Sequence, residues 1–204
     1  MRHDEGVPPA EILISVDIEA SGPTPSTGSL VAVGACLVGD LEVFFYEEIR
    51  PAEGAPWDTA TEPIHHLTRR HLAEHGAPAR ETAARWASWI EAVAGGSTPI
   101  MVGFNTAFDW MFVADLFHRH LGRNPFGVSA IDLKAVYLGR YAVQEWRRTT
   151  RRDVSVRHPT DLPMTHNALA DARSQAELAR LLLPSGLGDI EPSVRTPRSG
   201  HLGR

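Results

Sequence analysis

The segment EILISVDIEASG, residues 11–22, ends in two carboxylates, Asp17 and Glu19, that are separated by one residue. Branched apolar residues before them favour a β-strand. Side chains alternate between the two faces of a strand, so both carboxylates point the same way, with Cα atoms roughly 6.5–7 Å apart. Two such charges in an apolar strand repel each other unless a cation neutralises them. Oxygen ligands suit Mg²⁺ or Mn²⁺, and the simpler alternative is an acidic strand end that faces water.

Two helix starts further along the chain carry groups suited to the same chemistry. Asp109 lies near the start of a predicted helix in GFNTAFDWMF, where the helix dipole alone also explains a carboxylate. Near the C-terminus, THNALADA contains His166 and Asp171, which are five residues and therefore about 140° apart on a helix. They cannot share one helix face. We therefore expect His166 to precede the helix, Asn167 to cap it and Asp171 to lie in its first turns. Taken alone, His166 is better explained as a surface histidine, because the chain has ten histidines and one near an Asp is an easy coincidence.

The composition limits the kind of protein that can hold these groups. The chain has 204 residues, of which 43% are hydrophobic, which is enough for one full core and predicts a single domain. A net charge of −5 implies that any nucleic-acid binding is local, through a basic patch. The single Cys36 excludes an intrachain disulfide and is expected to be buried. We see no N-terminal leader and no apolar run near eighteen residues, so a cytoplasmic protein is expected.

The pattern of apolar residues predicts an α/β fold with a mixed sheet flanked by helices. The first three strands are expected to form an antiparallel meander. Predicted strands cover residues 11–22, 30–38, 41–50, 100–104 and 128–131. Predicted helices cover residues 63–74, 78–94, 107–121 and 132–144, with a last helix inside 166–183. The domain is expected to span residues 11–183, between a flexible lead-in (1–10) and a flexible tail (184–204).

The three acidic segments occur in a recognisable order, each at the end of an element. VDIEASG, GFNTAFDWMF and THNALADA together resemble the DEDDh branch of the 3′–5′ exonucleases, in the ribonuclease-H-like superfamily. The resemblance spans about residues 12–182 and includes the connecting segments PIHHLT and AIDLKA. The tyrosine branch of this family would place Tyr where this chain has Asn167. The nearest subgroup contains ribonuclease T, oligoribonuclease and related bacterial exoribonucleases.

The resemblance implies a ribonuclease-H-like fold and a two-metal mechanism with two divalent cations, Mg²⁺ or Mn²⁺. It implies that Asp17, Glu19 and Asp171 ligate one metal, that Asp17 bridges to a second and that Asp109 supports the second. His166 would be the general base, since imidazoles titrate near neutral pH. The implied reaction is hydrolysis of the terminal phosphodiester at a 3′ end of single-stranded RNA or DNA, which releases nucleoside 5′-monophosphates.

The resemblance also suggests where a substrate would lie and how the chain assembles. The loop after Glu19 and the start of the next acidic segment are expected to contact the terminal nucleotide, through Ala20, Ser21, Gly22, Asn105 and Phe108. A turn residue is the alternative for Ser21, and core packing is the favoured alternative for Phe108. The basic stretch WRRTTRR, residues 146–152, is a candidate to follow the phosphates or, alternatively, a solvated surface. Relatives often form homodimers, so a homodimer is expected here. Four tryptophans are expected in the core or at a subunit interface: Trp57, Trp86, Trp89 and Trp110.

Three other functions remain to be weighed. A phosphatase of the haloacid dehalogenase type needs Asp two residues after its nucleophilic Asp, where this chain has Glu19, and a later lysine, for which only Lys134 is available. An inactive nucleic-acid-binding module would usually lack one of the acids or the histidine, and none is missing. A DNA-directed exonuclease of the repair or proofreading type shares the same site, and only contacts to the 2′-OH separate it from an RNA enzyme. A stand-alone chain without a polymerase domain favours RNA.

Overall fold

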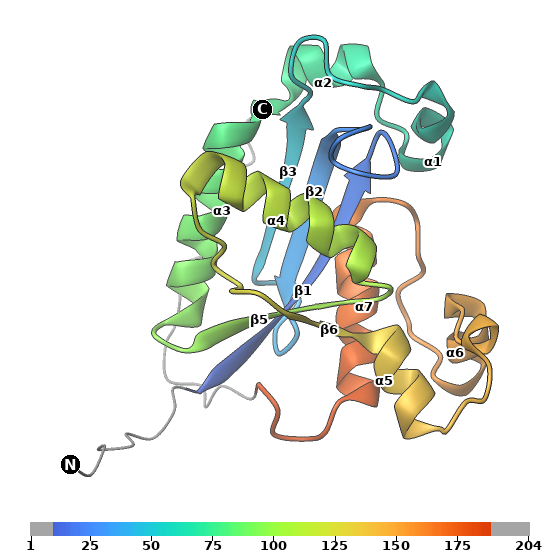
Figure 1. Cartoon of the computed structure of the whole chain (residues 1–204). Coiled ribbons are helices and arrows are strands. Elements are labelled where there is room, and N and C mark those ends of the chain that lie inside the picture. The colour runs from blue at the N-terminus through green and yellow to red at the C-terminus, as the bar shows by residue number, and fades with distance from the viewer. Residues whose placement is uncertain (1–9, 189–204) are drawn as a thin grey trace.

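A mixed β-sheet forms the centre of the protein in the computed structural model, which describes residues 10–188 (Figure 1). The six strands lie in the order β4-β3-β2-β1-β5-β6. Their bounds are β1 (Glu11–Ala20), β2 (Leu30–Leu37), β3 (Phe44–Arg50), β4 (Ala77–Pro78), β5 (Thr98–Gly103) and β6 (Ala130–Asp132). The first three pair antiparallel, while β5 is parallel to β1 and β6 to β5. The predicted α/β class, mixed sheet and antiparallel meander are confirmed.

Helices cover both faces of this sheet. Figure 1 shows α4 crossing the near face and α7 running behind the strands. The helices are α1 (Glu62–His65), α2 (Arg69–His75), α3 (Ala79–Ala94), α4 (Ala107–Leu121), α5 (Leu133–Arg140), α6 (Arg151–Arg157) and α7 (Ala168–Leu182), with 3-10 turns η1 (Thr59–Thr61) and η2 (Trp146–Arg148). Within residues 10–188, none of them has both the length and the apolar character that a membrane crossing requires. The predicted lead-in and tail lie outside the described residues, apart from residues 10 and 184–188.

The two faces of β1 belong to two separate cores. Ile14, Val16 and Ile18 pack into a cluster with residues of α3 and α4, and this cluster includes the fully buried Trp86. Leu13, on the opposite face, packs into a cluster with residues of α5 and α7, which also contains the buried Cys36. Because side chains alternate along a strand, Asp17 and Glu19 project to the α7 side. Trp89 and Trp110 pack against the α3–α4 cluster, whereas Trp57 lies outside both cores and donates to Glu62 at 2.8 Å.

The predicted single helix over residues 63–74 is wrong. The chain instead forms α1 and α2, separated at His66, whose φ of 60° lies in the left-handed region that ends helices. Nδ1 of the buried His65 accepts from the backbone N–H of Leu67, and Thr68 caps the second helix by accepting from His71. These local side-chain bonds compete with a continuous helix and explain the break.

A close contact between α7 and β2 sets the depth at which α7 lies on the sheet. Gly34 pairs with Asp17 across the β1–β2 ladder. A Cβ atom at Gly34 would collide with the backbone of Ala168 and Leu169 at the start of α7. Glycine therefore lets the first turn of α7 approach the sheet directly beside the acidic end of β1.

Candidate active site

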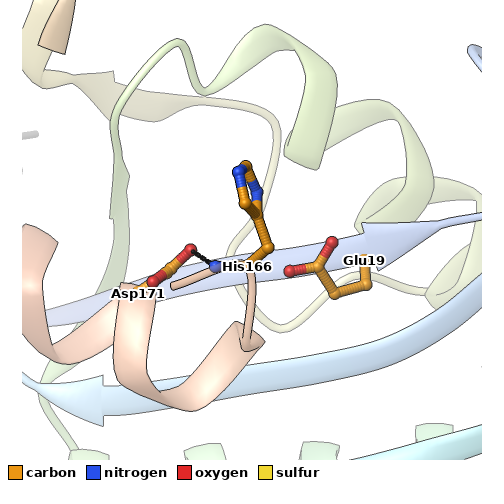
Figure 2. A group of neighbouring side chains, drawn as sticks. All are labelled: Glu19, His166 and Asp171. Atoms are coloured by element: carbon orange, nitrogen blue, oxygen red, sulfur yellow. Dashed lines mark hydrogen bonds between the residues drawn. The ribbon is translucent and has the colours of Figure 1, made fainter. Parts of the chain in front are cut away.

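The predicted acidic residues and the histidine meet in one cleft of about 220 Å³. β1 supplies Asp17 and Glu19, α4 supplies Asp109, the first turn of α7 supplies Asp171, and the loop before α7 supplies His166. In Figure 2, Glu19 extends from β1 and Asp171 from α7, with the His166 backbone between them. Glu19, His166 and Asp171 each offer a ligand atom within 4.8 Å of the other two. Segments that are far apart in the sequence thus build one acidic site.

Asp109 reaches this cleft because β1 has an open edge. The parallel partner β5 pairs with β1 only as far as Ser15. The backbone N–H of Ile18 lies beyond that point, and the Asp109 Oδ1 atom accepts its hydrogen bond at 3.1 Å. The carboxylate, which is 5% exposed, therefore replaces a missing strand and is fixed next to the β1 carboxylates.

Asp171 fixes the loop that carries His166. Its two oxygens accept from the backbone N–H groups of Thr165 at 2.6 Å and His166 at 2.9 Å. Asn167 caps α7 by accepting from Ala170, as predicted from the sequence. His166 itself precedes the helix, is exposed and has a φ of 56°, an unusual backbone conformation for a residue other than glycine. Such strain is typical of functional sites, where the surroundings hold it in place.

Burial and mutual repulsion make the carboxylates of this cleft hard to ionise. Burial, with the nearby Asp171 and Asp109, raises the pKa of Glu19 to about 8. Burial likewise raises the pKa of Asp109 to about 7, against the opposing effect of its hydrogen bond from Ile18. The pKa of Asp17 is also raised, first by burial and then by the charges of Asp109, Glu19 and Asp171. A cluster of this kind is stable in its ionised form only with a compensating positive charge.

The donor set fits divalent cations with oxygen ligands. All four acidic side chains end in the hard oxygen donors that Mg²⁺ and Mn²⁺ prefer. The described part of the chain offers no Lys or Arg ion pair to any of the four. The residues present therefore suit a metal centre.

The cleft walls include some of the predicted substrate contacts and omit others. Asn105 and Phe108 line the cleft. Ala20, at the end of β1, and Ser21 and Gly22, in the loop that follows, are buried and do not line it. The Ser21 hydroxyl, for example, accepts from the backbone N–H of Ser29 at 2.9 Å. A larger cavity of about 500 Å³ lies elsewhere, between this loop, α3 and α4, and its walls include none of the four carboxylates.

Comparison with known proteins places the chain in a family. No protein-family model matches it. The nuclease domain of 3′hExo, described as a DEDDh family member, superposes with a TM-score of 0.70 at 16% identity over 87% of this chain and 94% of that domain. The 3′–5′ DNA exonuclease Cap18 of Escherichia coli is 35% identical over 173 residues, which cover 84% of this chain and 91% of Cap18. The chain belongs to the DEDDh 3′–5′ exonucleases. E. coli exonuclease I, solved with a dT13 oligonucleotide, shares the fold at a TM-score of 0.64 and 18% identity; 84% of this chain matches 40% of that longer chain.

This DEDDh exonuclease contains a residue beside its acidic site that the sequence analysis missed. Gln175, which is 1% exposed, lies one helical turn after Asp171 on α7. Its side-chain N–H donates to Asp17 Oδ1, and its carbonyl accepts from the backbone N–H of Phe104 at 2.9 Å. The amide thus holds a β1 carboxylate against the end of β5. Its spacing of four from Asp171 is the only signal that the sequence contains.

The basic stretch at residues 146–152 is divided between two environments in this DEDDh exonuclease. Arg151 turns inward, where its guanidinium donates to Ser174 Oγ at 2.8 Å and lies 5.8 Å from the Phe104 ring centroid. Arg147 pairs with Glu145 at 2.7 Å on the surface. Arg151 therefore anchors α6 to α7, and a role in following phosphates is open only to the exposed members of the stretch.

Proposed function

We propose that this protein is a metal-dependent 3′–5′ exonuclease that removes nucleoside 5′-monophosphates from single-stranded nucleic acid. The observation that carries the proposal is the meeting of Asp17, Glu19, Asp109, Asp171 and His166 in one cleft. Family membership supports the reaction class. A phosphodiester is anionic, so a site of four carboxylates can accept it only when cations are bound there.

The four acidic side chains would hold two divalent cations, Mg²⁺ or Mn²⁺, as the sequence resemblance implies. Asp17, Glu19 and Asp171 would hold the first, with Asp17 shared, and Asp109 would support the second. When bound, the cations would neutralise the carboxylates and stabilise negative charge on the phosphodiester. Gln175 and the backbone N–H groups of Ile18, Thr165 and His166 orient the carboxylates in advance.

His166 would act as the general base that takes a proton from the attacking water. Its ring is exposed, so a water and a scissile phosphate can both reach it. Direct coordination of a metal is the other role open to this side chain, because its ring lies near Glu19 and Asp171.

Replacing His166 separates these two roles. If His166 is the base, the His166→Ala protein should lose activity by on the order of 10²–10⁴-fold and should keep its Mn²⁺ affinity and DNA binding. Isothermal titration measures the Mn²⁺ affinity, and single-turnover cleavage measures the activity. A large loss of Mn²⁺ affinity would assign His166 to the metal instead, and wild-type cleavage would exclude both roles.

We propose single-stranded DNA as the preferred substrate, because the relative Cap18, at 35% identity, is a DNA exonuclease. RNA, which the sequence analysis favoured, is the second candidate. Matched DNA and RNA oligonucleotides of one sequence, compared by kcat/KM, decide between the two.

Oligonucleotides labelled at either end test the reaction itself. A 5′-labelled strand should shorten in a ladder and a 3′-labelled strand should lose its label as mononucleotide, both abolished by EDTA. Asp17→Asn and Asp171→Asn should remove turnover and weaken Mn²⁺ binding. Internal cuts, or activity that survives EDTA, would overturn the proposal. The predicted homodimer is checked separately by the mass of the protein in solution.

A further inference from the structure

A half-exposed tryptophan and a partly buried lysine lie directly beside the candidate active-site cleft. Trp146 in η2 is 50% exposed, an unusual state for so large an apolar side chain. The Lys134 ammonium lies 4.4 Å from the Trp146 ring centroid and 3.5 Å from Asn105 Oδ1. Since Asn105 lines the cleft, one ammonium connects the indole to the edge of the candidate active site.

The backbone around Trp146 is fixed while its ring is left free. The hydroxyl of the buried Thr149 donates to the Trp146 carbonyl at 2.6 Å, and the N–H of Thr149 donates to the same carbonyl at 3.1 Å. The indole joins neither of the two hydrophobic cores. A rigid backbone that presents a half-exposed aromatic ring loses little entropy when a flat group stacks on it.

Charge at this surface favours an anionic strand. Lys134 is the only lysine in the chain, and among residues 10–188 its ammonium forms no ion pair with a carboxylate. The neighbouring Arg148 is exposed. Glu145, the adjacent acid, is already paired with Arg147. Single-stranded nucleic acids bind to surfaces of this kind, where aromatic rings take the bases and cations take the phosphates.

We propose that the Trp146 ring stacks on the base next to the 3′-terminal nucleotide, and that Lys134 contacts the phosphate on that side of the cleft. The proposal rests on the proposed exonuclease function and extends it to the strand upstream of the cleaved bond. The terminal nucleotide occupies the cleft at Asn105, and Lys134 and Trp146 lie successively further out. The penultimate nucleotide is then bound by α5 and η2, which contribute none of the four carboxylates.

Two substrates distinguish this surface from the catalytic cleft. The 4-nitrophenyl ester of thymidine 5′-phosphate has no upstream nucleotide, whereas a single-stranded oligonucleotide has many. In Trp146→Ala, the ratio of kcat/KM for the oligonucleotide to that for the ester should fall about 10-fold, mainly through KM. Trp146→Phe, which keeps an aromatic face, should restore most of the ratio.

Phe44→Ala is the matched control. Phe44 is 44% exposed and has the Arg173 guanidinium 4.7 Å from its ring centroid, but it lines neither cavity. Its ratio should equal that of the wild type. An unchanged ratio in Trp146→Ala, or an equal fall in the control, overturns the proposal. A wild-type protein that cleaves neither substrate would instead contradict the exonuclease function.

Acylation of Lys134 gives a readout that needs no turnover. With an N-hydroxysuccinimide ester, Mn²⁺ and the slowly cleaving His166→Ala protein, a bound oligonucleotide should slow modification of this single side-chain amine several-fold, measured by peptide mass spectrometry. The Trp146→Ala protein should lose much of that protection. Equal modification with and without saturating oligonucleotide would exclude Lys134 from the strand path.

Discussion

Gln175 shows how one uncharged side chain can organise an acidic centre. Its amide donates to Asp17 with one end and accepts from the Phe104 N–H with the other, so it links α7, β1 and the end of β5. Asp17 is the residue with the most acidic neighbours and would ligate both cations. A neutral donor can orient this carboxylate without competing with a metal for its charge.

Loss of the Gln175 amide should raise the Mg²⁺ concentration that cleavage requires, while the fold is largely kept. Gln175→Met keeps the side-chain volume but loses both hydrogen bonds. The Mg²⁺ concentration for half-maximal cleavage should therefore rise by about 10–100-fold. Metal titrations of cleavage measure this, and circular dichroism checks the fold. Gln144→Met, at an exposed glutamine, is the control. An unchanged Mg²⁺ requirement would leave Gln175 with a packing role alone.

At the level of elements, the start of α7 is the part on which the site depends most. Its first turn carries Asp171, its preceding loop carries His166, and its depth on the sheet is set by Gly34 of β2. A shift of this one helix end would therefore move a candidate metal ligand and the candidate base together.

Gly34→Ala should damage both stability and metal binding. The added methyl group meets backbone atoms of Ala168 and Leu169, which cannot rotate away, so a cost of about 1–3 kcal/mol in the free energy of unfolding is expected. Mn²⁺ affinity should fall as well. Gly39→Ala is the control, because a Cβ atom there would meet nothing within 4 Å. Urea unfolding and Mn²⁺ titration of the two variants give the comparison, and equal behaviour would contradict the role of Gly34.

For the whole molecule, the acidic cleft links stability to pH. In the folded protein the pKa values of Glu19 and Asp109 are raised to about 8 and about 7, from 4.5 and 3.8. At pH values between the unfolded and the folded pKa, the folded protein keeps these carboxyls protonated, and unfolding releases their protons. Stability from this source is fully present below pH 4 and is lost as the pH rises toward 8.

The metal-free protein should therefore melt at a lower temperature at pH 8 than at pH 5. One unit of raised pKa corresponds to about 1.4 kcal/mol, and each kcal/mol moves Tm by about 2–4 °C in a chain of this size. Thermal unfolding in EDTA at pH 5, 6.5 and 8 measures the effect. Saturating Mn²⁺ should recover most of the loss at pH 8, and Glu19→Gln should reduce the pH dependence. A Tm in EDTA that rises across this range would contradict the linkage.

Sequence reasoning succeeded where the determining signals are local. The helix over residues 107–121 agrees with α4, because the apolar period that predicts it lies within the helix itself. The Asn167 cap follows from the spacing of His166 and Asp171 in the same way. The meeting of the five site residues was expected from the order of three acidic segments in a known family.

Features that depend on contacts between distant segments were not predictable. Nothing near Gln175 in the sequence indicates Asp17, which lies 158 residues earlier. The inward turn of Arg151 depends on Ser174, a residue of another helix. The break at His66 was missed for a different reason, because the left-handed backbone there is unusual for a residue other than glycine.

The left-handed backbone of His166 has a consequence for how this enzyme class could lose its activity. Asp171 holds the loop through main-chain N–H groups, so the loop does not need an imidazole to keep its shape. Glycine adopts a φ of 56° more readily than histidine does. A His166→Gly change should thus give a well-folded protein that grips a 3′ end without cutting it. A single substitution would thus convert the nuclease into a protein that binds 3′ ends, of use as a capture reagent and open to natural evolution.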